Sequence, residues 1–355
     1  MNNKYCIIMA GGVGTRFWPM SRKSMPKQFL DILGTGKTFL RQTYERFAGI
    51  IAPENFIVVT NSQYKEIVLE QIPELSQRQI LCEPKGRNTA PCVAYAAFTL
   101  LKRDPDATMI VTPADNYISD DEHFISNIEE CTLFAENNNA LITIGIKPSR
   151  PETGYGYIQY SDKSHISRVK CFTEKPCLEI AQTLIQCGEF LWNSGIFVWK
   201  ACDIITAFEQ HMPDLHHLFQ SIVDDIDTDR QEQSINKVYS ECKSISIDHG
   251  VMERADNVYV RCGDFSWSDV GTWSSRYQLS RKDAYANHAP ESAILYDTRG
   301  SIISMPEDKL AVISGLKDYI VVDTEDLLMI CPQSEQARIK QFIEDVKYKS
   351  GKEFV

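Results

Sequence analysis

The sequence lacks several patterns that would place a protein in a special class. No apolar run reaches the roughly 18 residues that a membrane-spanning helix needs. The N-terminus has no long apolar stretch followed by a small-residue cleavage site. Positive charge is also in deficit, because the 355 residues carry a net charge of −11. We therefore expect no membrane association, no secretion signal and no general affinity for nucleic acid.

Paired metal-ligand spacings are absent as well. The eleven cysteines include no C-x-x-C pair, and the seven histidines include no H-x-x-x-H spacing. An odd number of scattered cysteines is typical of reduced thiols, and argues against a disulfide framework or a zinc site. The prediction is a cytoplasmic protein with free thiols.

The first half of the chain alternates short β-rich runs with longer helical patterns. The expected strands are 5–9, 56–60, 79–82, 108–112 and 140–146, and the expected helices are 38–49, 64–72, 89–102 and 122–138. Such alternation is typical of parallel βαβ units with helices on both faces of the sheet. Ligands of these folds bind at the carboxyl ends of the strands. A glycine-rich segment follows the first expected strand, and Pro113–Asn116 follows the fourth.

The pattern of expected elements changes toward the C-terminus. After mixed α/β segments in the middle, short strands recur from about Ser292 and a helix is expected near Glu335–Tyr348. The prediction is an α/β fold with a Rossmann-like, mixed but mainly parallel sheet, followed by a small β-rich domain with a final helix. The expected domains are residues 1–285, which are catalytic, and residues 286–355.

The segment Met9–Phe29 combines a glycine-rich turn with positive charge. Gly11, Gly12 and Gly14 allow a sharp turn whose N–H groups can cradle an anion. Arg16 can fork onto phosphate oxygens, and Lys27 supplies a mobile charge. The segment fits neither the P-loop nor the dinucleotide-binding pattern. From these residues alone, phosphate binding competes with an ordinary turn whose basic residues are only solvated.

A family resemblance is more specific. GGVGTRFWPMSRKSMPKQF resembles the signature of the sugar-nucleotide pyrophosphorylases, in the variant of the mannose-1-phosphate guanylyltransferases. Seven further stretches resemble that family in the same order, and they are CEPKGRNTAP (Cys82–Pro91), TPADN (Thr112–Asn116), TGYGYI (Thr153–Ile158), FTEKP (Phe172–Pro176), WNSGIF (Trp192–Phe197), SIDHGVME (Ser246–Glu253) and WSDVGTW (Trp267–Trp273). Thr173 and His249 stand where the family usually has Val and Tyr. The resemblance implies a nucleotidyltransferase fold of the glycosyltransferase-A-like kind.

The resemblance also implies a reaction, in which GTP and mannose 1-phosphate give GDP-mannose and diphosphate. The sugar phosphate is already an anion, so catalysis needs positioning and electrostatics and no general base. Arg16 and Lys27 are the expected catalytic residues, with Gly11, Gly12, Gly14 and Thr15 on the phosphates. Asp115 and Asp269 are the expected ligands of Mg²⁺, which takes one or two carboxylates together with phosphates. Each aspartate alone would more commonly be a cap or turn residue.

Glu83 is the candidate reader of the guanine base. A carboxylate only accepts hydrogen bonds, and guanine presents two adjacent donors, N1–H and N2–H₂. Pro84, Arg87 and Asn88 are expected beside it, although Glu83 could instead pair structurally with Arg87.

On the sugar side, the resemblance implies that a further set of residues binds mannose 1-phosphate, namely Gly154, Gly156, Glu174, Lys175 and Asn193. Two of these segments could instead be simple polar turns.

Two rival functions remain at this stage. One is a pyrophosphorylase for another sugar or nucleotide, and the other is a catalytically silent subunit that senses sugar nucleotides. The presence of Arg16, Lys27, Asp115 and Asp269 argues against the silent subunit. Some relatives carry a further isomerase domain of the cupin type, and we expect no isomerase activity here. The oligomeric state stays open, a homodimer included.

Overall fold

The computed structural model describes residues 3–161 and 164–355, and its contacts divide them into two compact units. Unit 1 comprises residues up to Gly11, Arg41–Ala114 and Ile118–Trp267. Unit 2 comprises Gly12–Leu40, Asp115–Tyr117 and Ser268–Val355. Two of the points where the chain passes from one unit to the other fall within short strands, β5 (Tyr117–Ile118) and β11 (Trp267–Ser268).

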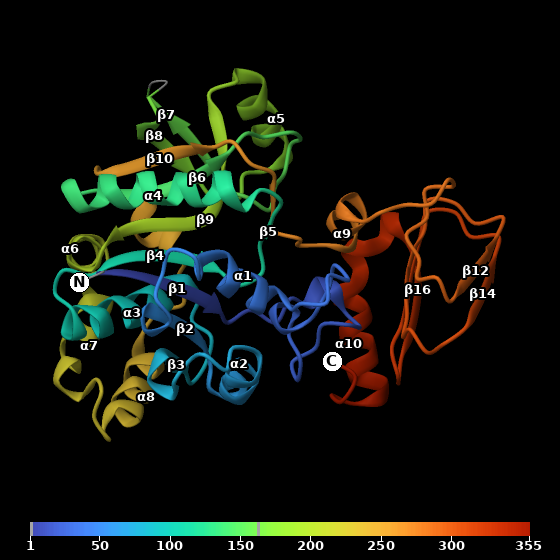
Figure 1. The fold of residues 1–355 in the computed structure, drawn as a ribbon, viewed down its shortest axis with the longest axis horizontal. Helices are drawn as coiled ribbons and strands as arrows, with labels where there is room; N and C mark the ends of the chain where they lie inside the picture. Colours follow the sequence, from blue (N-terminus) through green and yellow to red (C-terminus); the bar gives the residue numbers. More distant parts are fainter. Residues whose placement is uncertain (1–2, 162–163) are drawn as a thin grey trace. The chain divides into compact units, whose positions relative to one another are not determined.

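Unit 1 is built on a nine-stranded mixed sheet (Figure 1). The strands are β1 (Lys4–Ala10), β2 (Phe56–Asn61), β3 (Ile80–Glu83), β4 (Thr108–Pro113), β6 (Leu141–Ile146), β7 (Tyr157–Tyr160), β8 (Ile166–Thr173), β9 (Phe190–Lys200) and β10 (Val258–Gly263). Their order is β3-β2-β1-β4-β9-β6-β10-β8-β7. The run β3-β2-β1-β4 is parallel, and β9 is antiparallel to both β4 and β6. The carboxyl ends of β1, β2, β3 and β4 therefore share one edge of the sheet.

Helices bury both faces of this sheet. The helices of unit 1 are α1 (Phe39–Phe47), which begins in unit 2, α2 (Lys65–Gln71), α3 (Thr89–Arg103), α4 (Asp121–Asn137), α5 (Leu178–Cys187), α6 (Ala201–His211), α7 (Pro213–Gln220) and α8 (Gln231–Glu241). Figure 1 shows α4 alongside β6 and β9, with which it is in contact, while α3, α6 and α7 pack against one another. On β1, Cys6, Ile7 and Ile8 are all buried. Because successive side chains of a strand point to opposite faces, both faces of β1 are covered.

Unit 2 contains the C-terminal strands and the glycine-rich segment. Its elements are α9 (Trp273–Leu279), β12 (Ala293–Tyr296), β13 (Ile302–Ser304), β14 (Ala311–Ser314), β15 (Tyr319–Asp323), β16 (Leu328–Pro332) and α10 (Ile339–Ser350). Strands β12 and β14 form a parallel pair, and β13-β15-β16 form a second small sheet. Figure 1 shows α10 on one side of β16 and the pair β12 and β14 on the other. One buried hydrophobic cluster contains residues of the sheet β13-β15-β16 and of the N-terminal part of unit 2. In it, Phe17, Trp18 and Phe39 pack among Ile302, Ile320 and Val322.

The expected mixed α/β fold with a β-rich C-terminal part is confirmed, and the nine elements expected in the first half begin and end within two residues of their predicted bounds. The sequence analysis did not identify α5, α7, α9 and β10. It also did not identify a π-helical turn at Asp248–Met252. The expected final helix is divided, because a 3₁₀ stretch (Gln333–Arg338) precedes α10. Over the described residues, every helix is too short or too polar to cross a membrane. The division into domains 1–285 and 286–355 stays a proposal.

Candidate active site

The predicted site residues are distributed over both units. Unit 1 holds Gly11, Glu83, Pro84, Arg87, Asn88, Gly154, Gly156, Glu174, Lys175 and Asn193, whereas unit 2 holds Gly12, Gly14, Thr15, Arg16, Lys27, Asp115 and Asp269. We describe the two groups separately.

In unit 2, Lys27 joins three motifs that are far apart in the sequence. Its ammonium donates to Asp115 Oδ2 at 2.9 Å and to the Asp269 carbonyl at 2.6 Å. The Lys27 side chain is only 3% exposed, whereas Asp115 is 35% exposed. The rings of Phe17 and Phe39 lie 5.7 and 5.1 Å from the ammonium. The ammonium also donates to the Asp115 carbonyl at 3.3 Å, so the lysine is held by one carboxylate, two carbonyls and two aromatic faces.

The glycine-rich segment turns tightly beside this lysine. Gly14 has a φ of +64°, and a Cβ at that position would lie 2.6 Å from Lys27 Cβ. A larger residue would therefore be strained in its backbone and would also displace the lysine. Thr15–Phe17 follows as a 3₁₀ turn, on which Arg16 is exposed. The turn leaves the Arg16 guanidinium accessible to a solute anion.

Asp115 and Asp269 are suitable donors for a divalent cation. Both offer hard carboxylate oxygens, and both residues contact the Lys27 ammonium, Asp115 through its carboxylate and Asp269 through its main-chain carbonyl. Asp269 Oδ1 accepts from the Gly271 N–H at 3.0 Å, which fixes the orientation of that carboxylate. Among the described residues, no cluster of three or more histidine, cysteine or acidic side chains is suited to a metal. A Mg²⁺ ion bound here would therefore depend on substrate phosphates and water for its remaining ligands.

In unit 1, Glu83 is a buried carboxylate at the carboxyl end of β3. Its side chain is turned toward Gly11, where an added Cβ would lie 3.3 Å from Glu83 Oε2. The hydroxyl of Tyr239 on α8 donates to Glu83 Oε1 at 2.9 Å. Burial raises the pKa of Glu83 to about 7, although the Tyr239 hydrogen bond acts in the opposite direction. Near neutral pH, Glu83 therefore exists in two forms, an ionised carboxylate that only accepts hydrogen bonds and a protonated carboxyl that can also donate one.

The neighbours of Glu83 have structural partners. Arg87 donates from Nε to the Tyr239 carbonyl at 3.0 Å, near the end of α8. Asn88 is the N-cap of α3, and its side-chain oxygen accepts from the Thr89 N–H at 2.9 Å. Because Glu83 bonds to Tyr239, the structure does not show the Glu83–Arg87 ion pair that the sequence analysis left open.

Three of the predicted sugar residues of unit 1, Gly156, Glu174 and Asn193, lie close together. The Asn193 amide donates to Asp248 Oδ1 at 2.8 Å and accepts from the Thr143 hydroxyl at 2.8 Å. The Asn193 N–H bonds to the Gly156 carbonyl at 2.8 Å. Burial, and then the charge of Glu174, raise the pKa of Asp248 to about 6. The Asn193 side chain is therefore fixed in one orientation by a hydroxyl and a buried carboxyl.

Glu174 has the clearest sign of a missing partner. Its side chain is 5% exposed, and Oε1 accepts from Lys175 Nζ at 2.5 Å. The other oxygen, Oε2, is buried with no hydrogen-bond partner. A Cβ on Gly156 would lie 2.5 Å from this oxygen, so only glycine leaves room there. A buried carboxylate oxygen without a donor is costly, and a ligand hydroxyl would satisfy it.

Three loops of the predicted site have strained backbones. Asn88, Lys175 and Val270 have φ values of +67°, +48° and +42°. Val270 is the most unusual, because a β-branched residue rarely adopts a positive φ. Each follows directly on a predicted site residue, and such strain is common at functional sites.

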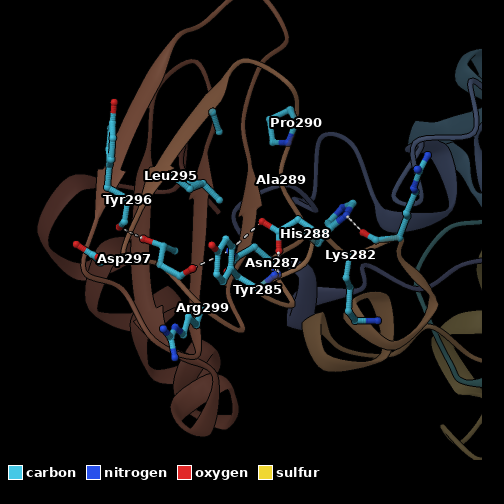
Figure 2. Close-up of a pocket in the computed structure, with 14 residues that line it drawn as sticks. Lys282, Tyr285, Asn287, His288, Ala289, Pro290, Leu295, Tyr296, Asp297 and Arg299 are labelled. Carbon is cyan, nitrogen blue, oxygen red and sulfur yellow. Dashed lines mark hydrogen bonds between the residues drawn. The ribbon is translucent and has the colours of Figure 1, made fainter.

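A separate cavity of unit 2 is not part of this group. Figure 2 shows this cavity of about 830 Å³, whose 14 lining residues all fall between Arg281 and Arg299. Its buried Asn287 donates to the Thr298 carbonyl at 2.8 Å and to Asp283 Oδ2 at 3.1 Å. All the predicted site residues lie outside this range of the chain.

Sequence reasoning missed three of the residues that organise the site. Tyr239 and Thr143 lie outside the motifs, and their roles depend on partners far away in the chain. Asp248 lies within SIDHGVME, so this stretch was noticed without the carboxylate being singled out. Its buried position beside Asn193 is what identifies it.

Comparison with known proteins places the chain in a family. Residues 5–285 match the model "Nucleotidyl transferase", and residues 291–346 match "MannoseP isomerase/GMP-like beta-helix domain". The chain is 35% identical to the mannose-1-phosphate guanylyltransferase of Escherichia coli K12, over 97% of this chain and 73% of that protein. It is 37% identical to the enzyme of the same name from Salmonella montevideo, over 98% and 75%.

Two solved structures have a similar fold. A structure from Thermus thermophilus, described as a mannose-1-phosphate geranyltransferase, is 30% identical with a TM-score of 0.87, over 97% of this chain and 99% of that one. A Helicobacter pylori structure, described as a mannose-6-phosphate isomerase, is 25% identical with a TM-score of 0.62, over 75% and 99%. This chain belongs to the nucleotidyl transferase family, in the group of the mannose-1-phosphate guanylyltransferases.

Proposed function

We propose that the protein transfers the guanylyl group of GTP to mannose 1-phosphate, giving GDP-mannose and diphosphate. The observation that carries the proposal is the meeting of Lys27, Asp115 and Asp269 at one ammonium group. The three residues come from different motifs, and Asp115 and Asp269 lie 88 and 242 positions after Lys27 in the sequence. A transfer between two polyanions needs such a concentration of fixed charge, and the names of the relatives supply the substrates.

On the nucleotide, each residue has a distinct role. The N–H groups of Gly12 and Gly14 and the guanidinium of Arg16 bind the triphosphate. Lys27 neutralises charge at the α-phosphate and on the leaving diphosphate. Glu83 accepts hydrogen bonds from guanine N1–H and N2–H₂ when it is ionised. Pro84 and Asn88 shape the turn beside the base, and Arg87 holds that turn to the end of α8.

On the sugar, Glu174 and Asn193 select hydroxyl groups. Glu174 Oε2 accepts from a mannose hydroxyl, and this supplies the donor that the buried oxygen lacks. Gly154 and Gly156 let the sugar approach the backbone, and Lys175 reaches the sugar phosphate. The phosphate oxygen of mannose 1-phosphate then attacks the α-phosphorus of GTP, and diphosphate leaves in line.

We propose Mg²⁺ as the metal, with Asp115 and Asp269 as its protein ligands. When bound, it would neutralise phosphate charge and orient the leaving group. Asp269 is the better-held ligand, because the Gly271 N–H fixes one of its oxygens.

We also propose a reducing, cytoplasmic location, because all eleven cysteines are free thiols in the structure. Thiol titration of the denatured protein without added reductant should find close to eleven. A homodimer stays a proposal for light scattering to test.

One assay tests the function directly. The purified protein with Mg²⁺ is given each of the four NTPs with mannose 1-phosphate or glucose 1-phosphate, and diphosphate release is followed. We expect release with GTP and mannose 1-phosphate above all other pairs. A preference for dTTP with glucose 1-phosphate would favour another pyrophosphorylase, and no release with any pair would favour the silent subunit.

A further inference from the structure

The glycine-rich segment is packed onto the C-terminal strands. Phe17 and Trp18 are buried in one cluster with residues of β13, β15, β16 and α10, and these are Ile302, Ile320, Val322, Met329, Cys331 and Ile339. Ile32 and Phe39, which follow Lys27 in the chain, belong to the same cluster. The segment that carries Gly12, Gly14, Arg16 and Lys27 thus shares a hydrophobic core with the C-terminal strands, both being parts of unit 2.

Arg22 ties this segment to the turn before β16. Its guanidinium donates to both carboxylate oxygens of Asp326, each at 2.6 Å, and to Thr324 Oγ1 at 3.2 Å. Its Nε donates to the carbonyl of Pro19, within the glycine-rich segment, at 3.0 Å. A fork of two parallel bonds fixes both distance and orientation. Although Arg22 lies in the phosphate-binding signature, its donors are directed at protein acceptors.

Trp18 supplies a second tie. The indole Nε1–H of Trp18 donates to the Phe354 carbonyl, near the end of the chain, at 2.7 Å. The indole of Trp273 on α9 donates to the Trp18 carbonyl at 3.4 Å. The segment is therefore held at its side chains and at its backbone by later parts of unit 2.

This packing reaches the catalytic lysine. Phe17 and Phe39 belong to the shared core, and their rings are the two that face the Lys27 ammonium. Gly14, in turn, is in close contact with the stem of Lys27. A shift of the segment over the C-terminal strands would therefore move the ammonium and the glycine turn together.

We propose that the C-terminal strands are the platform that positions the phosphate-binding segment, with Arg22 and Asp326 as positioning residues of the transferase. The inference rests on the proposed function for its effect on GTP. It assigns Arg22 to the platform, whereas Arg16, which is exposed on its turn, is the arginine left for phosphate.

The test uses the full chain with Asp326→Ala, Arg22→Lys and the charge exchange Arg22→Asp with Asp326→Arg. Because a displacement of about 1 Å can cost up to a hundredfold in rate, we expect Asp326→Ala to lower kcat/KM for GTP roughly tenfold. The KM for mannose 1-phosphate should hardly change. Arg22→Lys should cost less, and the exchanged pair should recover part of the loss, as coupled residues do in a double-mutant cycle.

A second readout needs no activity. Trypsin should cleave Asp326→Ala faster than the wild type after Arg16, Lys23 and Lys27, because the segment is released from its platform. This arm separates the two proposals. If the wild type transfers no guanylyl group, the proposed function fails, while faster cleavage still supports the platform.

The matched control is Asp227→Ala in unit 1, where Arg103 forks onto Asp227 at 2.6 and 2.9 Å. It removes a similar ion pair and should leave both kcat/KM for GTP and trypsin cleavage within residues 12–30 unchanged. The platform is wrong if Asp326→Ala resembles this control in both readouts. It is also wrong if Arg22→Lys is as damaging as an Arg16 variant while Asp326→Ala is silent, since Arg22 would then bind phosphate directly.

Discussion

Two buried carboxyl groups of unit 1, Glu83 and Asp248, are held differently from the Asp115 carboxylate of unit 2. In unit 1, Glu83 and Asp248 bond to neutral groups, a tyrosine hydroxyl and an asparagine amide. Burial raises their pKa values to about 7 and about 6. In unit 2, Asp115 is half-exposed and paired with the Lys27 ammonium. Glu83 and Asp248 therefore have neutral partners and raised pKa values, whereas Asp115 has a cation as its partner.

The difference matches two kinds of recognition. A base edge is neutral, so a buried carboxylate held by a neutral neighbour, as Glu83 is by Tyr239, can discriminate between hydrogen-bond donors. Phosphates carry charge, so they need cations whose own counter-charges are already in place. Substitutions in unit 2 should therefore affect turnover, and substitutions in unit 1 should affect the choice of substrate.

The largest effect should follow from Lys27→Met. The change keeps the buried stem and removes the ammonium that contacts Asp115 and Asp269. We expect kcat to fall by at least a few hundredfold, about 3–4 kcal/mol of transition-state stabilisation. The control is Lys309→Met, which breaks another lysine–aspartate pair of unit 2, that with Asp323 at 2.5 Å. Equal losses in the two variants would show that Lys27 is only structural.

Asp269→Asn should come next. The asparagine can still accept from the Gly271 N–H, and the Asp269 carbonyl still accepts from Lys27. The fold should be unchanged, but the side chain loses its negative charge. We therefore expect kcat to fall roughly a hundredfold and the Mg²⁺ concentration needed for half-maximal activity to rise. EDTA should abolish wild-type activity, and added Mg²⁺ should restore it. Full turnover in EDTA would contradict the assigned metal site.

Glu83→Gln should change selectivity more than turnover. The amide replaces one acceptor oxygen with a donor, so one guanine N–H loses its partner at a cost of about 1–3 kcal/mol. We expect kcat/KM for GTP to fall roughly ten- to a hundredfold. ITP lacks the exocyclic amine, so the GTP/ITP preference should narrow, while the KM for mannose 1-phosphate hardly changes. An unchanged GTP/ITP ratio would leave Asn88 or backbone groups as the base readers.

The sequence predicted the elements that depend on local patterns, and its motifs supplied the candidate site residues. The strand–turn pattern placed β1, β3 and β4, the signature pointed to Lys27, and the stretch Thr112–Asn116 pointed to Asp115. What it could not supply were partners chosen by tertiary contact. Tyr239 meets Glu83 across 156 residues, and Asp326 meets Arg22 across 304. No local pattern of side chains encodes either distance.

The missed elements have a similar cause. Strand β10 is six residues long, and its place between β6 and β8 depends on pairing with both of them. The π-helical turn Asp248–Met252 orients Asp248 toward Asn193, and a turn of this kind has no simple sequence period. Functional positions are where local rules are most often set aside, as the positive φ of Val270 shows.

The smallest predicted effect is a pH dependence that is specific to unit 1. Because burial raises the pKa of Glu83 to about 7, the carboxyl is mostly protonated at pH 6 and mostly ionised at pH 8. Only the ionised form accepts from both guanine donors. Since the apparent affinity scales with the competent fraction, the KM for GTP should fall roughly tenfold between these pH values.

The stability of the fold should decrease with rising pH, whereas the affinity for GTP should increase. The folded chain holds the Glu83 proton more tightly than the unfolded chain, in which the carboxyl titrates near 4.5. The free energy of unfolding should therefore fall as the pH rises from about 4.5 to about 7 and then level off. Glu83→Gln should flatten both profiles, which separates Glu83 from the titration of the GTP phosphates themselves. If KM for GTP changes with pH in the mutant as it does in the wild type, the GTP phosphates cause the change. Glu83 would then give no support to the contrast between the two units.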